Sequence, residues 1–299
     1  MAEINGIPDI ELFNSGHGAC FGCGAALAMR LIMKAAGKNT IVTQATGCME
    51  VISTPYPMTA WHVPFIHSAF ENTAATASGI YRSLKMQGKE DTKVLAIAGD
   101  GGTFDIGLQA LSGALERNEK ITFICYDNEA YQNTGIQRSG ATPLHAATTT
   151  TPYGKKIHGK MGSKKPTPLI VSAHRIPYVA TANIAYPQDL IKKVQKALKN
   201  QPSYVQILCP CTPGWKILSN LTIKIAKLAV ETRMQVLYEI ENGKLTINNL
   251  IENPKPLKEY LNLQGRFKNL SKEDIEEIQQ KINEEYSYLR EIEKEKAKI

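Results

Sequence analysis

The chain has 299 residues, of which 43% are hydrophobic and 21% charged, and a formal net charge of +7 at pH 7. These values are ordinary for a globular protein, and the length allows one large domain or two small ones. No apolar run approaches the roughly eighteen residues of a transmembrane helix, and the N-terminus, MAEINGIPDIEL, lacks a signal-peptide pattern. We therefore expect no membrane segment and a cytoplasmic location.

The first half of the chain alternates between helical and strand-like patterns. Apolar residues at helical spacing indicate helices, whereas short β-branched or continuous apolar runs indicate buried strands. The pattern predicts helices over 25–36, over 68–85 and after Thr103, and strands over 40–45, over 93–98 and from Ile121.

The second half resumes this alternation after a long loop. Residues 128–167 are rich in Gly, Thr and Lys and show no periodicity. Strands are predicted over 178–181 and 203–208, with a basic helix near 190–199 between them. Alternating strands and helices predict an α/β fold, in which a parallel sheet carries helices on both faces.

The composition changes after residue 234. Asn242-Gly243 predicts a hairpin, and a highly charged helix is expected from Ser271 to the end of the chain. Ser271 with Asp274 matches the capping pattern of a helix N-terminus. We expect two units: an α/β domain over 1–234, and an extension over 235–299 that packs on it or on a partner subunit.

Residues capable of binding metals follow four of the predicted strands. Cys48, Asp100, Asn128 and Cys211 each come just after a strand. In an open parallel sheet, ligands bind beyond the carboxyl ends of the strands, which lie at one edge. These four residues therefore predict one site.

Asp100 lies in a glycine-rich turn between a strand and a helix. Such glycines let a ligand approach the backbone, and the helix N-terminus favours an anion such as diphosphate. Asp100 alone would repel that anion, but Mg²⁺ between them removes the conflict by binding carboxylate, amide, carbonyl and phosphate oxygens. Asn128 can supply the amide oxygen, and Ala130 the carbonyl oxygen. The glycines of the turn are Gly99, Gly101 and Gly102.

Two other interpretations of this turn are weaker. A dinucleotide-binding loop would need a third glycine where GDGGTFDIG has Phe104. A tight turn with an aspartate helix cap, followed by an ordinary Asx-turn at Asn128, is disfavoured because the strand, helix, strand and Asn128 follow one another in register.

The cysteines predict a second metal centre. Cys20 and Cys23 form a Cys-x-x-Cys pair just before a helix, and Cys48 and Cys211 lie in turns beside Gly or Pro. Four thiolates suit structural zinc and a cubane iron–sulfur cluster equally well. Zinc sites, however, usually combine two Cys-x-x-Cys units.

The other two cysteines are expected in the core. Cys125 alternates with Phe123 inside a buried strand, and Cys209 ends its strand before Pro210. Cys211, beyond that proline, is therefore our choice for the fourth ligand.

Residues 153–200 contain ten Lys or Arg residues and one acid, Asp189. A solvated surface is the simplest interpretation. The alternative is that the loop lysines bind coenzyme A phosphates or an acidic ferredoxin: Lys155, Lys156, Lys160, Lys164 and Lys165. The basic charge alone is no argument for nucleic-acid binding, because the sequence shows none of the usual nucleic-acid-binding modules.

Together these motifs resemble the beta subunit of the 2-oxoacid:ferredoxin oxidoreductases, and within them the pyruvate synthase type. The resemblance covers nearly the whole chain. The family usually has Pro-Thr where this chain has Thr212-Pro213, which leaves Cys211 in place. The motifs that carry it are GHGACFGCGAA, TGCMEV, TPYPMTAWHVPFIHSAFENTAATASG, GDGGTFDIG, DNEAYQNTG and PCTPGW.

The resemblance implies a subunit that binds thiamine diphosphate through Mg²⁺ and carries a [4Fe-4S] cluster. It implies that Asn133 faces the reacting centre. It implies magnesium ligation by Asp100, Asn128 and Ala130, and cluster ligation by Cys20, Cys23, Cys48 and Cys211. The residues expected around thiamine diphosphate are Ala25, Gly47, Cys48, Gly99, Asp100, Gly101, Gly102, Asn128, Ala130, Tyr131, Gln132 and Asn133.

The implied reaction is the reversible oxidative decarboxylation of pyruvate with coenzyme A to acetyl-CoA and CO₂, with electrons passing through the cluster to ferredoxin. The implied partners are alpha, gamma and delta subunits. The glutamate that activates thiamine lies on the alpha subunit in this family, so this chain alone should be inactive. The alternatives are a branched-chain or other 2-oxoacid as substrate, or a non-redox thiamine enzyme with structural zinc.

Overall fold

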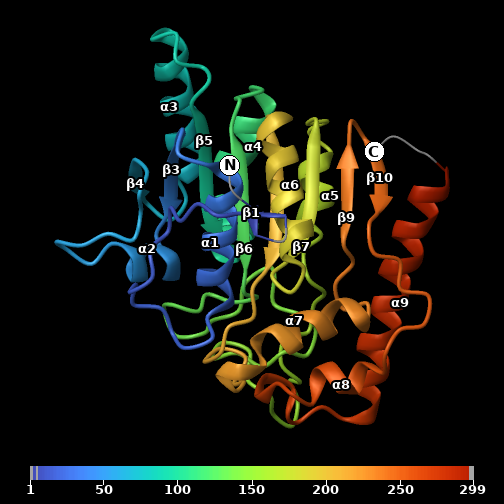
Figure 1. The fold of residues 1–299 in the computed structure, drawn as a ribbon. Coiled ribbons are helices and arrows are strands. Elements are labelled where there is room, and N and C mark those ends of the chain that lie inside the picture. Colours follow the sequence, from blue (N-terminus) through green and yellow to red (C-terminus); the bar gives the residue numbers. More distant parts are fainter. Residues whose placement is uncertain (1–2, 5, 296–299) are drawn as a thin grey trace.

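The computed structural model describes residues 3–4 and 6–295, and an eight-stranded sheet forms its centre (Figure 1). A separate two-stranded sheet, β1 (Glu3–Ile4) and β2 (Ile7–Pro8), lies at the N-terminus. The strands of the main sheet are β3 (Thr40–Ala45), β4 (Phe65–Ser68), β5 (Lys93–Gly99), β6 (Thr122–Asp127), β7 (Tyr178–Asn183), β8 (Ser203–Leu208), β9 (Tyr238–Glu241) and β10 (Lys244–Ile247).

The main sheet has the order β10-β9-β7-β8-β6-β5-β3-β4. The strands from β7 to β4 are parallel, whereas β9 pairs antiparallel with β7 and β10 antiparallel with β9. Every residue of β6, β7 and β8 is buried, as expected for central strands covered on both faces. The predicted parallel α/β sheet is confirmed.

Helices cover both faces of the sheet, also as predicted. On one face, α1 (Gly24–Ala36) packs against α6 (Pro187–Lys199). The other face carries α3 (Thr73–Met86), α4 (Leu108–Glu116) and α5 (Thr167–Ser172). The remaining α-helices are α2 (Cys48–Ser53), α7 (Thr222–Glu231), α8 (Leu257–Leu261) and α9 (Lys272–Glu295). None of the helices in the described part of the chain is long and apolar enough to cross a membrane.

The structure differs from the sequence prediction in two places near the site. The segment 65–68 forms the edge strand β4, so the helix expected from 68 begins only at Thr73. After β5 the chain makes a π-helical turn over Gly101–Asp105, with the Ile106 N–H donating to the Gly101 carbonyl at 3.3 Å. A four-residue edge strand and a single wide turn are too short to produce a periodic signal.

The C-terminal segment continues the sheet. The hairpin at Asn242-Gly243 is confirmed, and it adds β9 and β10 beside β7. The capping pattern is confirmed as well, because Ser271 N–H donates to Asp274 Oδ2 at 2.8 Å and Asp274 N–H donates to Ser271 Oγ at 3.1 Å. Helix α9 lies beside β10 (red in Figure 1). A division of the chain at residue 234 stays a prediction.

The loops that follow the parallel strands gather at one edge of the sheet. The long segment 128–166 lies there, with α2, α7 and α8 (lower part of Figure 1). This edge contains the predicted site.

Candidate functional site

A cavity of about 160 Å³ opens at the carboxyl ends of β5 and β6. It brings together ten of the twelve residues expected around a cofactor, with four others. The lining residues are Thr46, Gly47, Cys48, Phe70, Gly99, Asp100, Gly101, Tyr126, Asn128, Ala130, Tyr131, Gln132, Asn133 and Thr134.

Ala25 and Gly102 are the two expected residues that do not line this cavity. Ala25 lies in α1, where its backbone N–H reaches the thiol of Cys23 instead. Gly102 is buried in the π-helical turn, and a Cβ there would come within 3.1 Å of the Phe70 carbonyl oxygen. The structure thus puts Ala25 nearer to the cysteines than to the cavity.

Asp100 is 1% exposed, and its surroundings disfavour a lone negative charge. Burial, followed by the nearby Asp127 carboxylate, raises the pKa of Asp100 well above its usual value. Ser139 opposes this by donating from Oγ to Asp100 Oδ2 at 2.5 Å. A buried carboxylate beside another carboxylate is stable as an anion only when a cation compensates it.

The amide of the Asn128 side chain lies next to Asp100. One terminal atom of its amide is 2.8 Å from Asp100 Oδ1 and 2.9 Å from the Ala130 carbonyl oxygen. With nitrogen in this position, the amide donates to both oxygens; with oxygen there, three oxygens converge and need a cation between them. Adjacent ligands of an octahedral Mg²⁺, each about 2.1 Å from the metal, lie about 3 Å apart. The observed spacing fits that geometry.

The backbone around Asn128 is held from several sides. Trp215 Nε1 and Gln132 Nε2 both donate to the Asn128 carbonyl oxygen at 2.8 Å. The Gln132 Oε1 atom is buried beside Gly214 without a hydrogen-bond partner among the described residues. Gln132 therefore supports Asn128 through its amide nitrogen alone.

Sequence reasoning missed two groups at this site. Ser139, 39 residues from Asp100, contacts it directly, and Lys164 forms ion pairs with the residues on both sides of Asn128. Both lie in the long loop 128–166, where no periodicity indicates which side chains turn inward. Only the high density of lysines marked this loop as unusual.

The Cys20–Cys23 turn and the Cys211 loop are joined directly, although about 190 residues separate them. Gly24 N–H donates to the Pro210 carbonyl at 3.2 Å, and Thr212 Oγ1 donates to the Phe21 carbonyl at 2.9 Å. The approach is close enough that a Cβ on Gly24 would lie 2.8 Å from the Pro210 oxygen. The two turns therefore form one surface at the start of α1.

The thiols of this surface influence one another. Burial first, and then the charges of Cys23 and Cys20, raise the pKa of Cys48 to about 12. Burial likewise raises the pKa of Cys211 to about 12, with further contributions from Cys48, Cys23 and Cys20. Cys209 is fully buried in the core, where its Sγ donates to the Ile207 carbonyl at 3.2 Å.

The four sulfurs do not converge on a single point. Among the described residues, no three Cys, His, Asp or Glu side chains are placed to hold one metal ion. Zinc would need four sulfurs about 2.3 Å from one centre. In a cubane cluster each thiolate binds a different iron, so the sulfurs stay farther apart. The donor set fits a cluster better than zinc.

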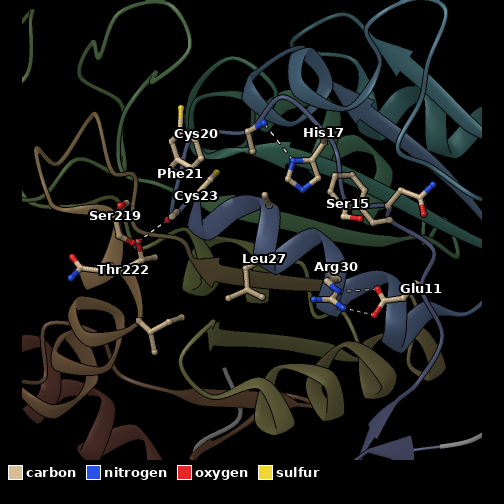
Figure 2. A pocket seen from close by; sticks show the side chains of 17 residues that line it. Glu11, Ser15, His17, Cys20, Phe21, Cys23, Leu27, Arg30, Ser219 and Thr222 are labelled. Carbon is tan, nitrogen blue, oxygen red and sulfur yellow. Dashed lines mark hydrogen bonds and ion pairs between the residues drawn. The ribbon is translucent and has the colours of Figure 1, made fainter.

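A second cavity, of about 630 Å³, lies beside the start of α1. Cys20 and Cys23 line it together with the Arg30–Glu11 ion pair, and the Phe21 ring beside them is 91% exposed (Figure 2). Cys48 lines the first cavity, whereas Cys20 and Cys23 line the second.

The chain is similar to known proteins over most of its length. Residues 45–207 match the family model described as thiamine pyrophosphate enzyme, C-terminal TPP binding domain. Pyruvate synthase subunit PorB of Methanocaldococcus jannaschii is 55% identical over 94% of this chain and 97% of its own length. The corresponding PorB of Methanothermobacter thermautotrophicus is 52% identical over 93% of this chain and 96% of its own length.

Two further relatives extend the comparison. Ketoisovalerate oxidoreductase subunit VorB of Pyrococcus furiosus is 49% identical over 96% of this chain and 94% of its own length. The solved 2-oxoglutarate:ferredoxin oxidoreductase of Magnetococcus marinus is 19% identical, with a TM-score of 0.57 over 74% of this chain and 81% of the other. At that identity the likeness is one of fold.

The close contact at Gly22 leads to a stability prediction. Gly22 has φ +73°, and a Cβ there would lie 2.3 Å from the Ser219 carbonyl oxygen. Gly22→Ala should therefore lower the free energy of unfolding by more than about 1 kcal/mol in urea denaturation. Gly79→Ala is the matched control: nothing lies within 4 Å of a Cβ at this position in α3, and it should not destabilise. Equal stability of the Gly22 variant and the wild type would refute the close packing.

The thiol pKa values lead to a second prediction. With a pKa of about 12, on the order of 10⁻⁴ of the Cys48 and Cys211 thiols are ionised at pH 8. Their alkylation by iodoacetamide in the cluster-free chain should then rise about tenfold per pH unit from pH 8 to 10, because only the thiolate reacts. Mass spectrometry of each peptide measures this. A plateau in alkylation near pH 9 would mean that the thiols ionise at their usual pH, and would contradict their burial.

Proposed function

The chain belongs to the family of the PorB and VorB subunits of pyruvate synthase and ketoisovalerate oxidoreductase, and from this membership we propose its reaction, cofactors and partners. It is the thiamine-dependent catalytic subunit of a 2-oxoacid:ferredoxin oxidoreductase. The proposed reaction is the reversible oxidative decarboxylation of pyruvate with coenzyme A to acetyl-CoA and CO₂. The proposed electron acceptor is ferredoxin.

The observation that carries the cofactor proposal is the meeting of Asp100 Oδ1, the Ala130 carbonyl oxygen and one terminal atom of the Asn128 amide, which lies 2.8 and 2.9 Å from those two oxygens. We propose that the Asn128 amide presents its oxygen there when the metal is bound, and that the three oxygens bind Mg²⁺, which in turn binds the diphosphate of thiamine diphosphate. The glycines around Asp100 leave the backbone open to that anion. When bound, thiamine diphosphate supplies the electron sink that allows a 2-oxoacid to lose CO₂. Asn133, exposed on the cavity wall, is proposed to face the reacting centre.

The small volume of the cavity supports a cofactor site that this chain shares with another subunit. Its 160 Å³ is well below the roughly 300–1,000 Å³ of complete small-molecule sites. We propose that this chain holds the diphosphate end, and that an alpha subunit covers the thiamine ring and contributes to substrate binding. Gamma and delta subunits are the other proposed partners. The chain alone should then be inactive.

A [4Fe-4S] cluster is proposed at Cys20, Cys23, Cys48 and Cys211. Support comes from the mutual influence of these thiols, and from Cys48 lining the first cavity while Cys20 and Cys23 line the second. When bound, the cluster accepts single electrons and passes them outward. None of the six cysteines, all of them in the described part of the chain, forms a disulfide, which supports a reducing, cytoplasmic setting.

The alternative substrate is a branched-chain 2-oxoacid, because the VorB relative is nearly as similar as the PorB relatives. The alternative metal is structural zinc in a non-redox thiamine enzyme. One set of measurements on the assembled enzyme distinguishes the proposed substrate and metal from these two alternatives.

The test is to assemble the enzyme with its alpha, gamma and delta subunits without oxygen. We expect about four irons and four sulfides at this chain's cluster, and ferredoxin reduction that is faster with pyruvate than with 2-oxoisovalerate. Cys211→Ala should lose the cluster, whereas Cys209→Ala, two residues away in the core, should keep it.

Three results would contradict the proposal. Zinc in place of iron would remove the electron path. Loss of iron from Cys209→Ala but not from Cys211→Ala would make Cys209 the fourth cluster ligand. Faster reduction with 2-oxoisovalerate would make the branched-chain acid the substrate.

A further inference from the structure

We propose that Lys164 is a positioning residue for the magnesium site, because it fixes the backbone that carries Asn128 and Ala130. This inference rests on the proposed magnesium and thiamine diphosphate site. It also gives a role to the basic loop, whose lysines were considered as ligands for coenzyme A or ferredoxin.

Lys164 forms ion pairs with the residues on both sides of Asn128. Its Nζ lies 2.5 Å from Asp127 Oδ2 and 2.9 Å from Glu129 Oε1. The two carboxylates are 1% and 4% exposed, respectively. Because they flank Asn128 in sequence, a single ammonium group holds both ends of the segment that presents the Asn128 amide to Asp100.

The backbone of this segment needs such support. Glu129 has φ +66°, a left-handed conformation that costs a residue with a side chain roughly 1–2 kcal/mol. Its other carboxylate oxygen accepts from Arg266 Nη2 at 2.7 Å, and its carbonyl accepts from Thr142 Oγ1 at 2.7 Å. Ala130, whose carbonyl is the third proposed ligand, is the next residue. A relaxed Glu129 would rotate that carbonyl away.

Neighbouring lysines of the loop also turn inward. Lys160 is 4% exposed and donates to the carbonyls of Gly140, Thr142 and Ser163. Lys165 donates to the carbonyl of Phe104, within the π-helical turn. The structure therefore differs from the expectation of a solvent-facing basic loop: these lysines fasten the loop to the site. Lys155 and Lys156, in contrast, are exposed.

Positioning and simple electrostatics predict opposite effects on Mg²⁺ binding. Removing a positive charge near a cation site should tighten Mg²⁺ binding if the charge acts only through space. If Lys164 acts through the geometry of residues 127–130, its removal should weaken binding, as loss of outer-shell partners usually does by about 10–100-fold. The direction in which the Kd for Mg²⁺ changes therefore distinguishes positioning from a through-space effect of the charge.

The experiment uses the assembled enzyme stripped of Mg²⁺ and thiamine diphosphate. Mg²⁺ is titrated at fixed thiamine diphosphate, and binding is followed by protein fluorescence without substrate. We expect Lys164→Met to raise the Kd for Mg²⁺ at least about tenfold, and Lys164→Arg to recover most of the affinity. Lys156→Met, an exposed lysine of the same loop, should leave the Kd unchanged.

The outcomes are distinguishable. Unchanged or tighter Mg²⁺ binding by Lys164→Met overturns the inference while leaving the proposed function intact. No Mg²⁺-dependent cofactor binding by the wild type overturns the proposed function itself. If Lys164→Met fails to assemble, Lys164→Gln replaces it: its side chain is uncharged and one atom shorter, so it should not hold both carboxylates, and an unchanged Kd in that variant overturns the inference.

Discussion

A carboxylate buried beside an anion site is the constraint on which the rest of the site depends. Asp100 is almost fully buried, and burial together with Asp127 opposes its negative charge. Such a group is stable as an anion only with a cation next to it. The Asn128 amide lies 2.8 Å from Asp100 Oδ1 and 2.9 Å from the Ala130 carbonyl oxygen, which is the arrangement from which we propose the magnesium site.

The parallel sheet explains how two centres come to share one edge. The carboxyl ends of β5 and β6 carry the oxygens, and the ends of β3 and β8 lead to Cys48 and Cys211. The start of α1 then brings Cys20 and Cys23 against the Cys211 loop through direct hydrogen bonds. The thiamine site and the four cysteines therefore become neighbours through strand order together with the position of α1, and Cys48 lines the same cavity as Asp100.

Much of this could be predicted from the sequence, because strand ends in a parallel sheet share an edge. Asp100 and Asn128 each follow an apolar run, so their meeting required only the correct fold class. The contacts of Ser139 and Lys164 could not be predicted, since the long loop has no periodicity to show which side chains turn inward. Ala25 was expected at the cavity but lies by Cys23, because α1 starts at the cysteine turn.

The most direct test of the account is the location of the metal. The assembled enzyme would be crystallised with thiamine diphosphate and with Mn²⁺ in place of Mg²⁺, and the manganese located by its anomalous scattering. We expect the ion within coordination distance of Asp100 Oδ1, the Asn128 side-chain oxygen and the Ala130 carbonyl oxygen, and in contact with the diphosphate. Manganese bound elsewhere, or an Asn128 amide nitrogen still donating to Asp100 with the cofactor present, would contradict it.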